Sequence, residues 1–133
     1  MVPAAQAYGI GIIPWSPLQG GLLSGAIRKQ AEGTGARSLE GRSAESMEKH
    51  RASIEAYEKH CAEIGEDPAN VALAWLLSRP GVTAPIIGPR TMEQLDGPMR
   101  SLEITLSEET LSTLDELFPP VGDGGPGPEA WAW

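Results

Sequence analysis

Two short apolar runs, at residues 10–13 and 84–87, constrain the fold of this chain more than any other feature. Each run is apolar on both faces and begins or ends next to glycine or proline, as strands buried in a parallel sheet do. Helical patterns separate the runs, and strands that alternate with helices pair in parallel through right-handed crossovers. We therefore expect an α/β fold, in which these two strands alone cannot form a stable sheet.

The region between the two runs carries two helical patterns. Side chains recur every three or four positions, as on one face of an amphipathic helix, at Met47, His50, Ile54, Tyr57, Cys61 and Ile64. Gly65 should end this helix, and Asp67 followed by Pro68 predicts the cap and first turn of the next one. Residues 69–78 are apolar nearly all round, so the second helix should be buried.

Two further helices are expected beyond the second run. Thr91 and Gln94 have the spacing of a capping box, and the Gly-Pro pair at 97–98 should end that helix early. Ser107 should cap the last helix. Residues 25–45, by contrast, are polar and rich in glycine with no period, which predicts a long loop.

Charge and composition exclude several classes of function for this chain of 133 residues. The net charge is −8, the pI is about 4.7 and no basic patch is present, which argues against a nucleic-acid partner. No apolar stretch approaches the roughly 18 residues of a membrane span. Cys61 is the single cysteine, which is compatible with a cytoplasmic location. His50 and His60 are ten positions apart on one helix, so we expect no metal site from them.

Three glycine patterns in the sequence bear some likeness to binding motifs. The stretch GIGIIP has Pro14 where a dinucleotide fingerprint needs its third glycine, and GGLLSGA has Ala26 where a phosphate-binding loop needs lysine. In IIGPRTMEQL, Gly88 lets the backbone approach a ligand, and a helix N-terminus follows with Arg90 beside it. Such a terminus favours an anion, although the pattern also fits an ordinary strand-to-helix turn.

Taken together, these segments resemble a known family. The stretch GIGIIPWSPLQGGLLSG, followed by VALAWLLSRPGVTAPIIGPRTMEQL, is similar to the C-terminal part of NADP(H)-dependent aldo-keto reductases in order and spacing. The resemblance implies a partial aldo-keto reductase domain over residues 1–118, followed by a tail at 119–133 rich in proline and glycine. It also implies the C-terminal portion of a (β/α)8 TIM barrel, with the two runs as strands seven and eight of an incomplete barrel.

By this resemblance, the segment after the first run would bind the nicotinamide and pyrophosphate of NADPH or NADP. Trp15 would stack on the nicotinamide ring, in the place of a family aromatic residue. The pyrophosphate would be lined by Ser16, Leu18, Gly20 and Leu22. Glycines suit this role because a side chain would keep phosphate oxygens away from the backbone amides. Without the resemblance, Trp15 would be read as an indole of the core or of its rim.

The segment after the second run would hold the adenosine end of the cofactor, again by resemblance. Gly88, Arg90 and Thr91 would bind the 2′-phosphate, with Arg90 as its bidentate partner. Gln94 would lie near the adenine. The chain departs from the family at 97–98, where a Gly-Pro pair stands in place of an acidic residue and an asparagine that reach the adenine.

The catalytic Asp, Tyr, Lys and His of the family come from the N-terminal half of the barrel, and their motifs do not occur here. We therefore assign no catalytic residue. The resemblance implies the cofactor-binding C-terminal part of an oxidoreductase that reduces aldehydes and ketones to alcohols, inactive as this chain alone. Its expected partners are the missing N-terminal half-barrel or a further copy, through exposed strands. The alternative is a non-catalytic module that binds a nucleotide or a protein partner.

Overall fold

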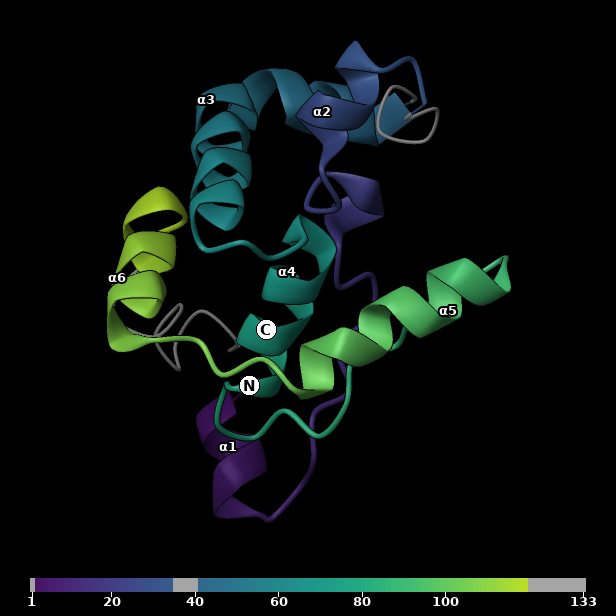
Figure 1. Ribbon diagram of the computed structural model, residues 1–133. Helices are drawn as coiled ribbons and strands as arrows, with labels where there is room; N and C mark the ends of the chain where they lie inside the picture. The colour runs from purple at the N-terminus through teal and green to yellow at the C-terminus, as the bar shows by residue number, and fades with distance from the viewer. Residues whose placement is uncertain (1, 35–40, 120–133) are drawn as a thin grey trace.

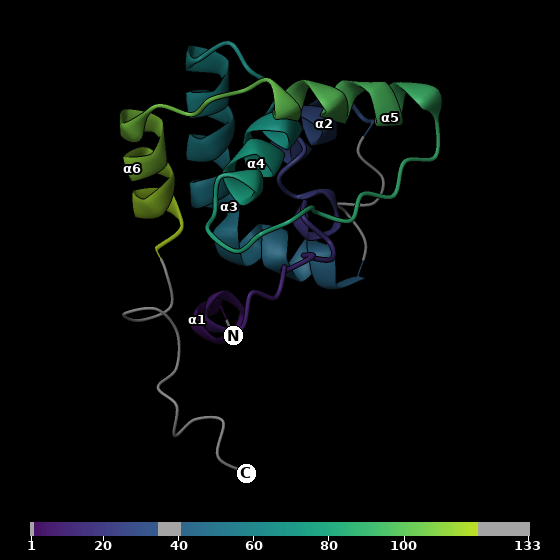
Figure 2. The same ribbon diagram turned by 90° about the horizontal axis from the view of Figure 1, so that it is seen from below.

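The structure, a computed structural model, describes residues 2–34 and 41–119 (Figure 1). Its elements are α1 (Val2–Ala7), η1 (Gln19–Gly21), α2 (Ala26–Ala31), α3 (Gly41–Glu63), α4 (Pro68–Leu77), α5 (Met92–Met99), η3 (Arg100–Leu102) and α6 (Glu108–Leu117). The long helix α3 is central, because α2, α4, α6 and η1 all contact it. Figures 1 and 2 show α1 at one end of the molecule, outside the group formed by α3, α4 and α6.

The amphipathic helix predicted between the two apolar runs is confirmed as α3. Four of its predicted stripe residues are buried, namely Met47, Ile54, Tyr57 and Cys61. His50, within the same stripe, and Ile64, directly after the end of α3, are exposed. The period of three and four residues therefore identified the face of α3 that packs against the other helices.

The predicted helix caps are also confirmed. The Asp67 carboxylate accepts a hydrogen bond from the Ala69 N–H at 2.9 Å, with Pro68 in the first turn of α4. The Thr91 hydroxyl accepts from the Gln94 N–H at 3.2 Å at the start of α5. Ser107 caps α6 through the Thr110 N–H at 3.1 Å. In each helix the side-chain oxygen satisfies one of the free N–H groups of the first turn.

Two clusters of buried side chains form the core. The first joins α3, α4 and α6 and contains Tyr57, Cys61, Val71, Ala72 and Leu114. The second joins α2 and the turn before it to α3 and contains Leu22, Ala26, Met47 and Ile54. The second cluster attaches the segment that follows Trp15 to the central helix α3.

The expected portion of a TIM barrel is wrong for this structure. Within residues 2–34 and 41–119 no strand is formed, and the described elements are all helical. The runs at 10–13 and 84–87 are extended chain, and the backbone pairing near them is one isolated parallel bridge between Ile12 and Val82. The expectation of two strands covered on both faces therefore fails.

The two runs do not form strands because prolines remove backbone N–H donors and because helices do not cover both faces of the runs. Pro14 ends the first run and Pro85 stands inside the second, and neither can donate an N–H to a ladder. Ile10, Ile13 and Ile86 are 60%, 58% and 50% exposed, so no layer of helices covers both faces of the runs. An isolated pair of short extended segments is marginal in water.

Two smaller expectations also need correction. Part of the loop predicted at 25–45 is helical, since it contains α2 and the start of α3, and residues 35–40 lie outside the described residues. The Gly-Pro pair at 97–98 does not end α5 early, because that helix continues to Met99 with Pro98 inside it. The tail predicted from 119 falls outside the described residues from position 120 onward.

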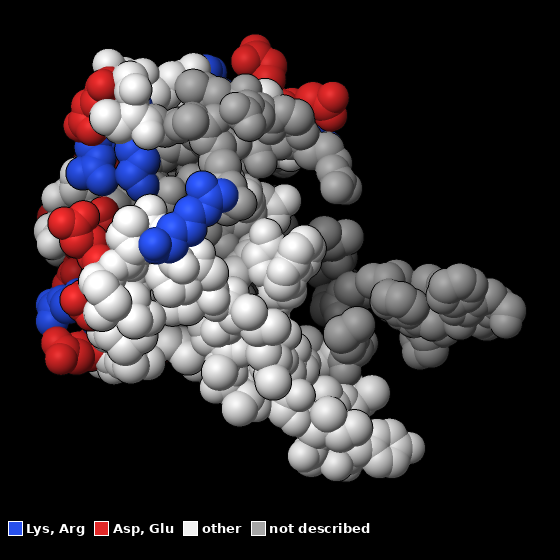
Figure 3. Space-filling view, turned by 90° about the vertical axis from the view of Figure 1, so that its right-hand side faces the viewer, with Lys and Arg blue, Asp and Glu red and all other residues white. Residues whose placement is uncertain are grey.

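The surface has an uncharged side. Residues 2–27 contain no Lys, Arg, Asp or Glu. Figure 3 shows charged side chains along the left and at the top of the view, and a white area without charged side chains toward the lower right. Among the described helices, none is both long enough and apolar enough to cross a bilayer.

Candidate functional site

Three backbone hydrogen bonds hold the two apolar runs side by side. They join Ile12 N to Gly81 O (2.8 Å), Thr83 N to Ile12 O (2.8 Å) and Ile86 N to Pro14 O (2.9 Å). The third bond lies where the two runs end. Trp15 follows its acceptor directly and Gly88 comes two residues after its donor, so the structure brings the starts of the two predicted cofactor segments together.

After Trp15 the backbone curls into a left-handed turn, which we call the glycine turn (residues 16–22). Its left-handed φ angles are 56° at Ser16, 50° at Gln19, 68° at Gly20 and 98° at Gly21. Glycine adopts such angles freely, whereas each non-glycine residue there costs on the order of 1 kcal/mol. Backbone that alternates between right-handed and left-handed conformations forms concave nests of N–H groups, which bind anions.

Some N–H groups of the glycine turn close the turn, and others donate to no backbone acceptor among the described residues. The Gln19 N–H donates to the Ser16 carbonyl at 3.0 Å, and the Gly21 N–H donates to the Leu18 carbonyl at 2.9 Å. Within residues 2–34 and 41–119, the N–H groups of Ser16, Leu18 and Gly20 donate to no backbone acceptor. The turn therefore has three donors for a ligand or for water.

The side chains around the glycine turn differ in what they can offer. Trp15 is 82% exposed, so one face of its indole can receive a flat ring. The Leu22 side chain is buried against α3 in the second core cluster, and a ligand could contact this residue through its backbone alone. Leu18 is half-buried against the first cluster.

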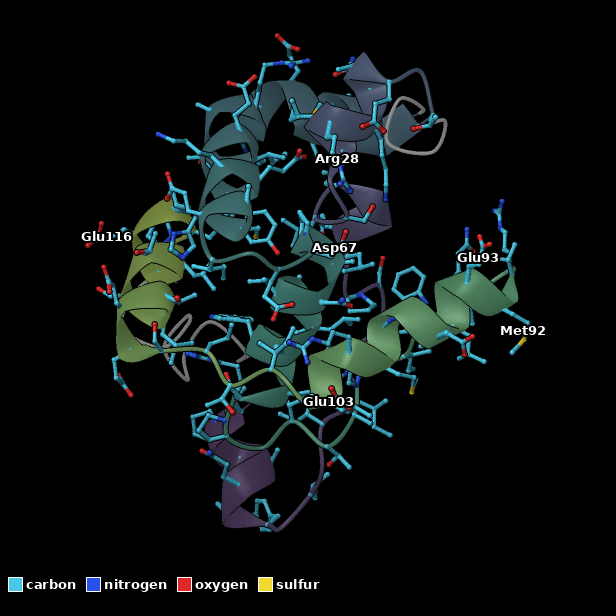
Figure 4. The ribbon with its side chains drawn as sticks, viewed as in Figure 1. Arg28, Asp67, Met92, Glu93, Glu103 and Glu116 are labelled. Carbon is cyan, nitrogen blue, oxygen red and sulfur yellow. The ribbon has the colours of Figure 1, made fainter. Side chains whose placement is uncertain are left out.

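The predicted adenosine-end residues Arg90, Thr91 and Gln94 meet at the start of α5. Besides the Thr91 cap, the Gln94 amide oxygen accepts from the Arg90 N–H at 2.9 Å. Arg90 is exposed, and in the described part of the chain it makes no ion pair. Figure 4 shows this end of α5, marked by Met92 and Glu93, projecting from the other helices. Gly88 is exposed beside it.

Neither of two hollows on the described surface is lined by the two segments. The two best-formed hollows of the described surface measure about 330 and 450 Å³ and are lined by other residues. One lies between α4 and the η3 region, and the other lies between α1 and the first apolar run. The predicted site is thus an open surface in this chain.

Residues that the sequence analysis did not single out support the glycine turn. The Ser24 hydroxyl donates to the Gly21 carbonyl at 2.7 Å, and the Lys29 ammonium donates to the Ser24 oxygen at 3.1 Å. The Glu58 carboxylate of α3 accepts from two N–H groups in the first turn of α2, at 2.7 and 3.0 Å. No local pattern marks Glu58, since its partners are about thirty positions away in the sequence.

A surface ion pair also links α2 to the start of α4. Arg28 lies 3.5 Å from the carboxylate of Asp67, and Figure 4 shows the two side chains between these helices. Both side chains are about half exposed, at 54% and 45%, and such pairs contribute little to stability. Asp67 is therefore more important as the cap of α4.

Two buried titratable side chains, Tyr57 and Cys61, are unsuited to acid–base or nucleophilic chemistry near neutral pH. Burial raises the pKa of the Cys61 thiol to about 11. Burial, with the nearby Cys61, raises the pKa of the Tyr57 phenol well above its ordinary value. The Tyr57 O–H donates to the Pro68 carbonyl. Among the described residues, no group of three or more His, Cys, Asp or Glu side chains could hold a metal ion.

Comparison with known proteins assigns the chain to a family. The sequence pattern of the Aldo/keto reductase family matches residues 1–118. This chain belongs to the aldo/keto reductase family. Both segments of the candidate site lie inside the matched range, so the residues considered above are part of the aldo/keto reductase sequence.

Individual members of this family are similar to the chain along nearly its whole length. An uncharacterized oxidoreductase of Bacillus subtilis, YrpG, is 48% identical over 133 residues, which are 100% of this chain and 39% of the relative. The versiconal hemiacetal acetate reductase of Aspergillus parasiticus is 33% identical over 90% of the chain and 36% of its own length. The norsolorinic acid reductase of Emericella nidulans is 32% identical over 90% of the chain and 29% of its length. The chain thus spans less than two-fifths of these relatives.

Proposed function

We propose that this chain is the cofactor-binding part of an NADP(H)-dependent oxidoreductase that reduces aldehydes or ketones to alcohols. The observation that carries the proposal is the glycine turn, in which three N–H groups donate to no backbone acceptor of the described residues. Backbone hydrogen bonds hold this turn beside the segment of Arg90. Family membership and two relatives named as reductases support the reaction class.

Each part of the site has a role in the proposal. The N–H groups of Ser16, Leu18 and Gly20 bind the pyrophosphate, since backbone amides in such turns are good anion ligands. Trp15 stacks on the nicotinamide through its exposed indole. The Arg90 guanidinium pairs with the 2′-phosphate, for which its planar fork is suited. Bound NADPH would supply the hydride for carbonyl reduction.

The proposal includes no catalytic residue of this chain. Reduction of a carbonyl needs an acid that protonates the oxygen as hydride arrives, and a positioned acid contributes about 10² to 10⁴ in rate. The described tyrosines do not meet this need, because Tyr57 is buried with a raised pKa and Tyr8 lies 81% exposed after α1. We infer that the chain by itself binds the cofactor without reducing carbonyls. The single cysteine is in keeping with a cytoplasmic enzyme.

Calorimetric titration of the chain with NADPH tests the proposal. Saturable binding of one NADPH per chain is expected, with weaker binding of NADH. NADPH oxidation should not accelerate when a reactive aldehyde is added to the complex. Absence of binding would refute the cofactor role, and rapid aldehyde-dependent oxidation would refute the inactivity of the chain.

A second candidate, a partner-binding module, is favoured by one observation. Tyr8, Ile10, Ile13 and Trp15 are 81%, 60%, 58% and 82% exposed within the uncharged stretch. Exposed apolar side chains that are close together mark sites of association. Under this candidate the partner is further polypeptide of a longer reductase or another copy of the chain, and the chain binds no nucleotide.

A further inference from the structure

We propose that Glu58 is a positioning residue for the glycine turn, an inference that rests on the proposed cofactor function. Glu58 lies on α3 and would not touch the cofactor. It acts by fixing α2, the helix that follows the glycine turn, in one position on the central helix. Cofactor affinity then depends on a side chain that neither cofactor segment contains.

The contacts of Glu58 replace a missing helix cap. Gly25 is the N-cap of α2, with a φ angle of 81° and no side chain that could bind the first N–H groups. Glu58 Oε1 accepts from the Ile27 N–H at 2.7 Å, and its Oε2 accepts from the Arg28 N–H at 3.0 Å. Both carboxylate oxygens are thus used on adjacent amides. Charge-assisted bonds of this kind are the stronger ones in proteins.

A chain of contacts connects α2 back to the glycine turn. Lys29 of α2 donates to Ser24 at 3.1 Å, and Ser24 donates to the carbonyl of Gly21 at 2.7 Å. Leu22 of the turn and Ala26 of α2 also share one buried cluster with α3. Any rotation or slide of α2 along α3 would therefore move the C-terminal side of the glycine turn.

Apolar packing alone cannot fix this arrangement as sharply. Burial of Leu22 and Ala26 is favourable in many orientations, because the hydrophobic effect has no direction. Two hydrogen bonds from one carboxylate to neighbouring amides do have direction, since they weaken steeply with angle. Amides that are already placed for a phosphate lose less conformational entropy on binding. Glu58 thus supplies preorganisation of the turn.

Binding of two ligands to the full chain tests this inference. NADPH would contact both segments, whereas 2′-AMP carries only the adenosine and the 2′-phosphate. We expect Glu58→Ala to weaken the binding of NADPH about tenfold, because the variant loses a charged hydrogen-bond acceptor. Affinity for 2′-AMP should change by less than about twofold, within the range of a surface substitution. Glu58→Gln, which keeps one acceptor oxygen, should recover part of the NADPH affinity.

Glu63→Ala is the matched control, because Glu63 is exposed on the same helix and pairs on the surface with Lys59. It should leave both affinities unchanged. Unchanged NADPH binding in Glu58→Ala would overturn the inference while leaving the cofactor proposal intact. An equal loss of affinity for NADPH and 2′-AMP would also overturn the inference, because it would indicate general destabilisation. If Glu58→Ala does not fold, Glu58→Gln gives the same comparison of the two ligands. A wild-type chain that binds neither ligand would refute the proposed function itself.

Discussion

Arg90 is the residue on which cofactor preference should depend. Its side chain is exposed at the start of α5, while its backbone N–H is held by Gln94. A phosphate–arginine contact contributes roughly 1.5 to 3 kcal/mol. Arg90→Ala should therefore weaken NADPH by about tenfold or more. The affinity for NADH, which lacks the 2′-phosphate, should be nearly unaffected. Competitive titration of the two nucleotides measures the ratio of the two affinities.

Arg51→Ala provides the control for this prediction, because Arg51 lies on α3 and pairs with Glu55 at the surface. It removes the same charge at a place far along the chain from both cofactor segments. An NADPH-to-NADH ratio that stays constant in Arg90→Ala would place the 2′-phosphate elsewhere.

The Cys61 thiol should be unreactive in the folded chain. It is fully buried, and burial raises its pKa to about 11 from an ordinary value of 9.0. Thiol reagents attack the thiolate, which is scarce below the pKa and inaccessible here. Labelling by a maleimide at pH 7.5 should be slow in buffer and fast in denaturant. Rapid labelling of the native chain would show that the cluster around Tyr57 opens readily.

The same pKa shift has a consequence for stability. The thiol of the unfolded chain ionises near 9.0, and that of the folded chain near 11. The protonated Cys61 therefore makes its full contribution to the free energy of unfolding below pH 9, and this contribution is lost as pH rises toward 11. The melting temperature of the wild-type chain should fall as pH rises from 9 to 11. The melting temperature of the Cys61→Ala variant should fall less steeply over the same range. Equal slopes would assign the alkaline loss to other groups.

At the scale of the element, the cap of α4 is the most testable feature. Asp67 accepts from the Ala69 N–H and also pairs with Arg28 across to α2. Loss of an N-cap costs about 1 kcal/mol, whereas an exposed ion pair contributes less. Asp67→Ala should thus lower the free energy of unfolding by about 1 kcal/mol in urea melts. Asp67→Asn keeps the cap without the charge and should cost much less; equal losses would assign the effect to the ion pair.

The helices also show which features of the fold can be predicted from the sequence. Caps such as Asp67 and Thr91 and the buried stripe of α3 were predicted, because each depends on residues within one or two turns. The prediction of strands in the two apolar runs was wrong, since strand formation depends on neighbouring strands and on backbone N–H donors, which Pro85 lacks. In the candidate site, the capping contact of Gln94 could be predicted locally. The contact of Glu58 with α2 could not, because it arises only when α2 packs on α3.

For the whole molecule, the exposed apolar side chains predict association. Ile10 and Ile13 lie in the uncharged stretch and are more than half exposed. Size-exclusion chromatography with light scattering should show oligomers that increase with concentration. Ile10→Ser should shift the distribution toward the monomer, while Ile64→Ser, in the turn directly after α3, should not. A monodisperse monomer at all concentrations would contradict this prediction.

The cofactor should bind at the glycine turn and at the start of α5. Titration of the isotopically labelled chain with NADP, followed by amide resonances in nuclear magnetic resonance spectra, tests this most directly. We predict that the largest changes occur at the amides of Ser16, Leu18 and Gly20, together with those of Gly88 and Arg90. Saturable changes confined to other residues, or no changes at millimolar NADP, would contradict the assignment of the glycine turn and the start of α5 as the cofactor site.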